Sequence, residues 1–226
     1  MALSATLDED QLQSLCSLYL QKPVLIRDRV NRPNMKLNIG KYKAKRTSKG
    51  NENLVWMDTA REISKIVGEE YAIVYMDFRK DVDFIVNCLK DAGIEDARAY
   101  HGKLTQKDKK EIDRAFCNKE FQILVATESY EVGTHSPHVH NVFRVGCMRN
   151  AGVIVQEFGR AGRGGEQSDG YLLINEHKDD QRLNYWAQQC KSDEEVSIKK
   201  KYQELWKWIY GIYNGTCLRT SLLKVV

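Results

Sequence analysis

The chain contains one short segment in which glutamine, arginine and glycine stand at spacings suited to phosphate chemistry. From Val155 to Gly165 it reads Val-Gln-Glu-Phe-Gly-Arg-Ala-Gly-Arg-Gly-Gly, so Arg160 and Arg163 lie close together among glycines. An arginine side chain is a planar, charged fork that matches phosphate oxygens, and glycine lets the backbone approach a ligand closely. The segment predicts a phosphate clamp. The alternative is a solvated basic loop after a core helix, since short motifs match by accident.

The rest of the central sequence predicts the elements that must position this segment. Short apolar runs alternate with stretches of helical periodicity. This alternation predicts a parallel sheet with helices on both faces, whose ligands bind at the loops after the carboxyl ends of strands. Residues 77–79, His101 and Thr127 fall on such loops. Strands are predicted at 72–76, 97–100, 121–126, 141–145 and 171–174, and helices at 54–67, 81–92, 105–116 and 151–159.

The composition is that of an ordinary globular protein. A length of 226 residues suits one large or two small domains, and 42% hydrophobic residues can supply a core. The net charge of +4 permits nucleic-acid binding without demanding it. No apolar run is long enough for a bilayer, so no membrane contact is expected. The cysteines are scattered without C-x-x-C spacing, which predicts buried thiols in a reducing, intracellular compartment.

Several further motifs carry a family resemblance through their order and spacing. Three of them precede the Gln-x-x-Gly-Arg-Ala-Gly-Arg segment: Tyr-His-Gly-Lys-Leu at 100–104, Ile-Leu-Val-Ala-Thr at 123–127 and a Gly-x-x-x-Pro turn at 133–137. Together they resemble the second motor lobe of superfamily 2 helicases, and RecQ-type DNA helicases most closely. The strand at 72–76 with Arg79 resembles the first motif of that lobe. Leu-Ser-Ala-Thr at 3–6 resembles the motif that ends the first lobe.

The resemblance implies an α/β fold. This is a three-layer RecA-like domain with a mostly parallel central sheet, helices on both faces and a short helical C-terminal extension. Residues 1–50 would be an interlobe segment that trails the first motor lobe, with a helix at 7–20 and short strands near 24–26 and 35–39. Residues 51–176 would form the second RecA-like lobe. Residues 177–226 would be a helical extension that leads into a truncated zinc-binding subdomain.

Half of the motor chemistry is missing from this sequence. A helicase needs a phosphate-binding Gly-x-x-x-x-Gly-Lys-Ser/Thr loop and an acidic magnesium-binding motif, and the sequence contains neither. Both belong to the first RecA-like lobe of the family. ATP with Mg²⁺ is therefore expected to be held mainly by a first lobe of the same chain, and this lobe alone is predicted to be inactive as an ATPase.

The resemblance assigns one group of residues to the nucleotide. Arg163 would be the arginine finger that stabilises the charge on the γ-phosphoryl oxygens, with Arg160 beside it. Gln156 would couple the nucleotide state to closure of the two lobes, which is a hinge-type motion. Gly133 and His135 would also contact the nucleotide.

A second group is expected to contact DNA, either single-stranded or at a duplex junction. Such contacts reach phosphates and carry no sequence information, which suits a translocating motor. A structural alternative stays open for some of them: Thr127 caps a turn, Arg79 is solvated, and His101 is a satisfied loop histidine. The expected DNA contacts are Thr127, His101, Gly102, Lys103 and Arg79.

One cysteine has a metal-binding counterpart in the family. Thr-Cys-Leu-Arg at 216–219 resembles the start of the zinc-binding subdomain, in which four cysteines hold the metal. A single thiolate cannot build a structural zinc site, so Zn²⁺ is expected only in a longer protein. The alternative for Cys217 is an ordinary, partly buried cysteine.

The sequence also departs from the family pattern. Glu-Ser-Tyr-Glu at 128–131 replaces small and apolar residues, and His135 stands where Asn or Asp is usual. Arg-Val-Gly-Cys at 144–147 replaces a His-x-Asp/Asn-like segment, and Gly164-Gly165 replaces Asp-Gly. The leading hypothesis is the C-terminal lobe of a divergent RecQ-like helicase that acts in DNA repair and recombination in the nucleus. The alternatives are a non-catalytic nucleic-acid or protein interaction module derived from a decayed helicase, and an RNA helicase lobe.

Overall fold

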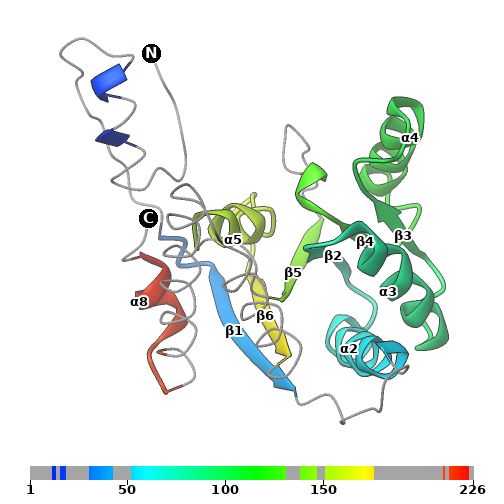
Figure 1. Cartoon of the computed structure of the whole chain (residues 1–226), viewed down its shortest axis with the longest axis horizontal. Helices are drawn as coiled ribbons and strands as arrows, with labels where there is room; N and C mark the ends of the chain where they lie inside the picture. Colours follow the sequence, from blue (N-terminus) through cyan, green and yellow to red (C-terminus); the bar gives the residue numbers. More distant parts are fainter. Residues whose placement is uncertain are drawn as a thin grey trace, which may run out of the picture.

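The computed structural model describes residues 12–13, 16–18, 31–42, 52–130, 138–146, 151–175, 211 and 214–223. Its centre is one six-stranded sheet with the strand order β1-β6-β5-β2-β4-β3 (Figure 1). Every paired strand runs parallel to its neighbour. The predicted α/β architecture with a parallel sheet is therefore confirmed.

The elements alternate along the chain as the sequence pattern predicts. The strands are β1 (Met35–Tyr42), β2 (Tyr71–Met76), β3 (Ala97–Tyr100), β4 (Ile123–Ala126), β5 (Val139–Val145) and β6 (Ser168–Asn175). The helices are α2 (Glu52–Val67), α3 (Arg79–Asp91), α4 (Gln106–Cys117), α5 (Ala151–Phe158) and α8 (Leu218–Leu223), and a short 3₁₀ turn, η1, spans Glu128–Tyr130.

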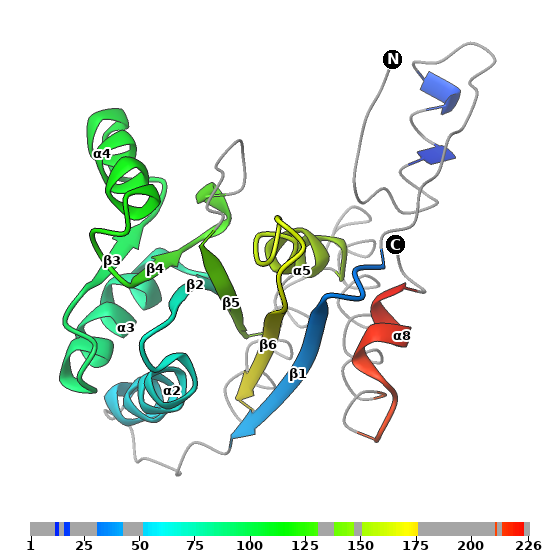
Figure 2. The ribbon, with the colours of Figure 1, turned by 180° about the vertical axis from the view of Figure 1, so that it is seen from behind.

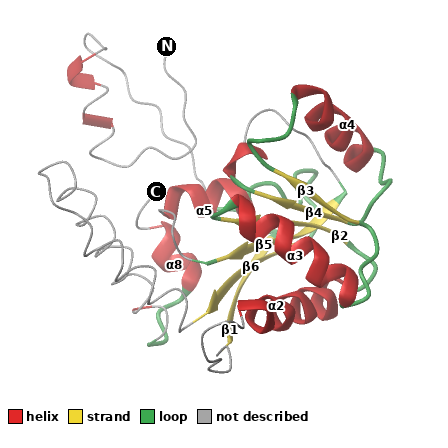
Figure 3. Cartoon of the chain, turned by 45° about the vertical axis from the view of Figure 1, so that its right-hand side comes forward, coloured by secondary structure: helices red, strands yellow, loops and turns green. Residues whose placement is uncertain are grey.

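Both faces of the sheet are buried. Side chains alternate along each strand, so strands β2 to β6 each contribute to a hydrophobic cluster on either face. In β2, Ile73 and Tyr75 join one hydrophobic cluster, while Val74 and Met76 join another on the opposite face. Helices α2 and α3 cover the second face (Figure 3). The first face is covered by α4 and α5, and Leu218 of α8 belongs to the same cluster. Burial on both faces explains the nearly continuous apolar runs of the central strands.

Local signals set the helix ends as expected. Thr105 precedes α4 and forms a reciprocal capping box with Asp108, because the Thr105 hydroxyl accepts the Asp108 N–H at 3.1 Å. After α3, the chain turns at Gly93, whose φ of +95° suits glycine. These ends direct the chain from α3 into β3 and from α4 towards β4.

The edge strand β1 lies further upstream than the predicted lobe. It pairs in parallel with β6 from Met35↔Ser168 to Tyr42↔Asn175. Viewed from behind, β1 runs beside β6 with α8 on its outer side (Figure 2). The predicted division at residue 50 therefore falls after one strand of this sheet.

Several expected features lie outside the described residues. These are the motif at 3–6, most of the helix at 7–20, the strand at 24–26, the turn at 133–137 and most of the tail beyond residue 176. Within the described residues, none of the helices combines the length and apolar character that a membrane span requires.

Candidate nucleotide and nucleic-acid interface

The fold brings the predicted site residues to two places on the sheet. Strands β5, β2, β4 and β3 are neighbours and run parallel, so the loops after their carboxyl ends lie side by side. Asp77 to Arg79 follow β2, Thr127 follows β4, and His101 to Lys103 follow β3. The segment 159–166, which we call the arginine loop, follows α5 and lies at the amino ends of β5 and β1, because the Gly162 N–H donates to the Val139 carbonyl oxygen and Asn34 Nδ2 donates to the Glu166 carbonyl oxygen.

Glycine geometry shapes the arginine loop. Gly162 has a φ of +56°, and its N–H donates to the Val139 carbonyl oxygen at 3.1 Å. A Cβ atom at this position would lie 2.6 Å from the Glu166 carbonyl oxygen, so no larger residue fits without a shift. The Arg163 Nε–H donates to the Gly159 carbonyl oxygen at 3.3 Å. The loop therefore folds back on the end of α5.

Three guanidinium groups gather at this loop. Arg163 is exposed, yet surrounding protein lowers its pKa by desolvation, and the positive charges of Arg160 and Arg32 lower the pKa further. The nearby Tyr75 and Tyr130 oppose this shift. Arginine keeps its charge under such shifts, so the cluster is a concentrated positive patch that attracts anions. Gln156 is half-buried on the last turn of α5, next to this patch.

A buried ion triad joins β5 to the end of β2 and to α5. Arg144 of β5 is fully buried, and its guanidinium donates to Glu157 Oε1 at 2.9 Å and to Asp77 Oδ1. Asp77 lies at the end of β2, and Glu157 belongs to α5 beside Gln156. A buried guanidinium is tolerated only when charged partners satisfy it. Arg144 thus ties the loop before α3 to the helix that carries the arginine loop.

In the sequence, Arg144 stands out only as a departure from the family pattern. Its guanidinium donates to Asp77, which is 67 positions away in the chain. The available signal was an arginine inside the apolar strand Val-Phe-Arg-Val, because a charge in a buried strand requires a partner.

Thr127 occupies a turn with a second hydroxyl beside it. Its Oγ1 lies 3.0 Å from Ser129 Oγ, and its carbonyl oxygen accepts the Tyr130 N–H at 3.2 Å. The Thr127 N–H donates to the Tyr100 carbonyl oxygen at 3.1 Å, so this amide is already engaged. The side chains of Thr127 and Ser129 are half-buried and together present two hydroxyls at the carboxyl end of β4.

His101 is engaged by α3. Its side chain is 9% exposed, and Nε2 lies 3.1 Å from Asp83 Oδ1. Nδ1 of the same ring is buried and has no hydrogen-bond partner among the described residues, so the ring is only partly satisfied. Gly102, Lys103 and Arg79 are exposed on the same edge, with Arg79 in the first turn of α3. Their positions are compatible with phosphate contacts at helix and strand ends.

The remaining predicted residues divide into two cases. Gly133 and His135 lie outside the described residues. Cys217 is exposed, and its pKa is lowered first by hydrogen bonds from the backbone N–H and hydroxyl of Thr220, and then by Arg219. Among the described residues, no group of three or more His, Cys, Asp or Glu side chains could hold a metal ion. The zinc assignment stays a prediction.

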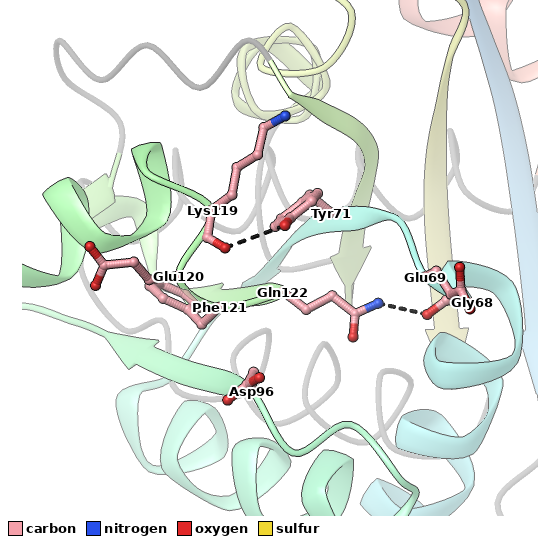
Figure 4. A pocket seen from close by; sticks show the side chains of 8 residues that line it. All are labelled: Gly68, Glu69, Tyr71, Asp96, Lys119, Glu120, Phe121 and Gln122. Carbon is pink, nitrogen blue, oxygen red and sulfur yellow. Dashed lines mark hydrogen bonds between the residues drawn. The ribbon is translucent and has the colours of Figure 1, made fainter.

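A shallow hollow lies at the amino ends of β2, β3 and β4 (Figure 4). Its volume is about 290 Å³, and its walls include Tyr71, Lys119 and Gln122. Gln122 Nε2 donates to the carbonyl oxygens of Gly68 at 2.6 Å and Glu70 at 3.0 Å. These bonds join the turn after α2 to the start of β4. The hollow contains none of the predicted site residues.

Comparisons with known proteins agree with the geometry. Residues 57–165 match the family described as helicase conserved C-terminal domain. The chain is 29% identical over 179 residues to "Probable ATP-dependent DNA helicase RecS" of Bacillus subtilis, covering 76% of this chain and 33% of that protein. It is 27% identical over 224 residues to "ATP-dependent DNA helicase RecQ" of Bacillus subtilis, covering 99% of this chain and 35% of that protein.

A solved structure supports the same fold. The Mycobacterium smegmatis helicase Lhr bound to ssDNA and AMP-PNP has a TM-score of 0.62 at 20% identity, covering 88% of this chain and 26% of that chain. This similarity establishes a RecA-like helicase fold. The chain spans about a third of the length of the two curated relatives, at 33% and 35%.

Proposed function

Because the chain contains the helicase C-terminal domain of a RecQ-like helicase, we propose that it is the second motor lobe of an ATP-dependent DNA helicase. In this role it supplies the arginine finger from the arginine loop and part of a DNA phosphate track. The cluster of Arg32, Arg160 and Arg163 around the arginine loop is the observation that supports this proposal most directly.

Arg163 is the proposed finger. Arg163 is exposed on the arginine loop, so another lobe can bring a triphosphate against it. Negative charge spreads over the γ-phosphoryl oxygens during hydrolysis, and an arginine supplied across the cleft is worth about 10³- to 10⁵-fold in turnover. Arg160 reinforces the positive field, and Gln156 reports lobe closure through α5. A first lobe supplies most of the contacts to ATP and Mg²⁺.

The proposed phosphate track follows the strand ends in space. Arg79 leads into α3, the hydroxyls of Thr127 and Ser129 lie after β4, and Gly102 with Lys103 lies after β3. Cations, hydroxyls and helix N-termini contact phosphates without reading bases. The His101 side chain braces its loop by pairing with Asp83 of α3.

One observation favours the alternative of a non-catalytic interaction module. Glu128 is exposed on the loop that carries Thr127, where its charge repels phosphates. The arginine cluster favours the motor. The same proposal includes a role in DNA repair and recombination in the nucleus. It also includes Zn²⁺ bound through Cys217 in a longer protein.

Phosphate release from ATP tests the proposal. The chain alone is expected to show no turnover with single-stranded DNA present, because it lacks the phosphate-binding loop and the acidic magnesium motif. A polypeptide that joins a first lobe to this chain is expected to hydrolyse ATP in a DNA-dependent manner. Turnover on the order of 1–100 s⁻¹ by the chain alone, or none by the joined lobes, would contradict the motor and favour the interaction module.

A further inference from the structure

The arginine loop is held by a segment from a distant part of the sequence. The guanidinium of Arg32, upstream of β1, donates to the Gly159 carbonyl oxygen at 3.1 Å and to the Gly162 carbonyl oxygen. Asn34 Nδ2 donates to the carbonyl oxygens of Gly162 at 3.0 Å and Glu166 at 2.8 Å. Two side chains therefore hold three carbonyl groups along the loop.

This clamp is placed where the loop needs it. Glycines leave the backbone many accessible conformations, so a glycine-rich loop has no strong intrinsic shape. The Gly159 carbonyl follows the last turn of α5, where the helix dipole is negative and a cation is favourable. Charge-assisted bonds from Arg32 are stronger than neutral bonds. Arg32 thus fixes the loop at Gly159 and at Gly162, the residue before Arg163.

A second arginine holds the clamp itself. Arg219 of α8 donates from Nη1 to Asn31 Oδ1 at 2.6 Å and to the Arg32 carbonyl oxygen at 3.0 Å, and from Nη2 to the Met35 carbonyl oxygen. It therefore binds the segment both before and after Arg32. The neighbouring Leu218 is 4% exposed and packs in the core cluster that includes residues of α5, so α8 is anchored on the body of the domain.

We propose that Arg219 is a positioning residue for the arginine finger. Arg219 holds the segment 31–35, Arg32 and Asn34 of this segment hold the arginine loop, and the loop sets the position of Arg163. The C-terminal helix α8 thereby controls hydrolysis without contacting the nucleotide. The functional half of this inference rests on the proposed motor function, whereas the structural half stands without it.

Hydrogen–deuterium exchange on the chain itself tests the structural half. In Arg219→Ala, exchange across 159–166 is expected to rise about tenfold or more, because the clamp loses its support, while β2 stays protected. Arg32→Lys is expected to act similarly, since lysine keeps the charge but cannot hold two carbonyl oxygens as a fork. Arg61→Ala is the matched control, because Arg61 is exposed on α2 and pairs only weakly with Asp58 at 3.4 Å.

Kinetics of the joined lobes test the functional half. Arg219→Ala is expected to lower kcat about 10- to 100-fold, as misplacing a catalytic group does, and to leave the KM for ATP within about twofold. Unchanged exchange at 159–166 in a folded Arg219→Ala overturns the inference, as does unchanged kcat when Arg163→Ala is inactive. If Arg219→Ala unfolds, Arg32→Lys decides, because it leaves α8 intact. Failure of the motor function itself is separate, since Arg163→Ala would then leave turnover unchanged.

Discussion

Replacing Arg144 with methionine removes the only cation of the buried triad while keeping a long apolar side chain. The carboxylates of Asp77 and Glu157, whose side chains are 3% and 0% exposed, then stay buried without the Arg144 guanidinium. Breaking a buried ion pair by deleting one partner costs about 3–5 kcal/mol, because the remaining charge stays desolvated. A domain has roughly 5–15 kcal/mol of stability in total, so Arg144→Met is expected to remove at least about a fifth of it.

Urea denaturation of the chain measures this loss. At a slope of about 2 kcal/mol/M, the midpoint is expected to fall by about 2 M. Arg98→Met is the control: Arg98 is an exposed arginine 4.6 Å above the Phe121 ring, and its loss is expected to cost under about 1 kcal/mol. Adding Glu157→Gln to Arg144→Met is expected to recover part of the stability, because one of the two desolvated charges is removed.

The pH dependence gives an independent check on the mechanism. Without Arg144, burial and mutual repulsion raise the pKa of the two carboxyl groups in the folded state. The folded variant then binds more protons than the unfolded chain, so the deficit against wild type shrinks as the pH falls through that raised pKa. A midpoint within about 0.3 M of wild type, or a deficit that does not depend on pH, would refute the account of the triad.

Two further predictions concern charge and reactivity at the surface. Glu128→Ala is expected to tighten binding of single-stranded DNA, because a charge that repels phosphates is removed. The slope of log affinity against log salt concentration is expected to be shallow, at about −0.7 per neutralised phosphate. Fluorescence anisotropy at several salt concentrations measures both, and weaker or unchanged binding speaks against the phosphate track. The lowered pKa of Cys217 raises its thiolate fraction near neutral pH, so iodoacetamide is expected to modify it before the exposed Cys117. Peptide mass mapping decides this, and equal rates would contradict the hydrogen bonds from Thr220.

The sequence predicts the local elements well because their signals are local. Periodicity places α3 and β4, and Thr105 with Asp108 marks the start of α4. Parallel pairing has no local signal, so the strand order and the place of β1 beside β6 follow only from the structure. The family resemblance, rather than periodicity, indicates the helicase fold.

The candidate site shows the same division. The motif places Gln156 on α5 and Arg160 and Arg163 on the loop that directly follows it. The residues that hold them are distant in sequence and carry no motif of their own: Arg32 and Arg219 bind backbone carbonyls, and Arg144 binds carboxylates. His101 belongs to a motif, yet its pairing with Asp83 of α3 cannot be predicted from Tyr-His-Gly-Lys-Leu.

Arg163→Ala, in a polypeptide that carries this chain together with a first motor lobe, tests the central claim most directly. Steady-state phosphate release with single-stranded DNA would be measured beside nucleotide affinity, with Arg61→Ala as the control. The finger acts on charge that develops in the transition state, so turnover is expected to fall about 10³- to 10⁵-fold while nucleotide affinity changes little. Unchanged turnover, or a loss confined to nucleotide affinity, would contradict the assignment of Arg163.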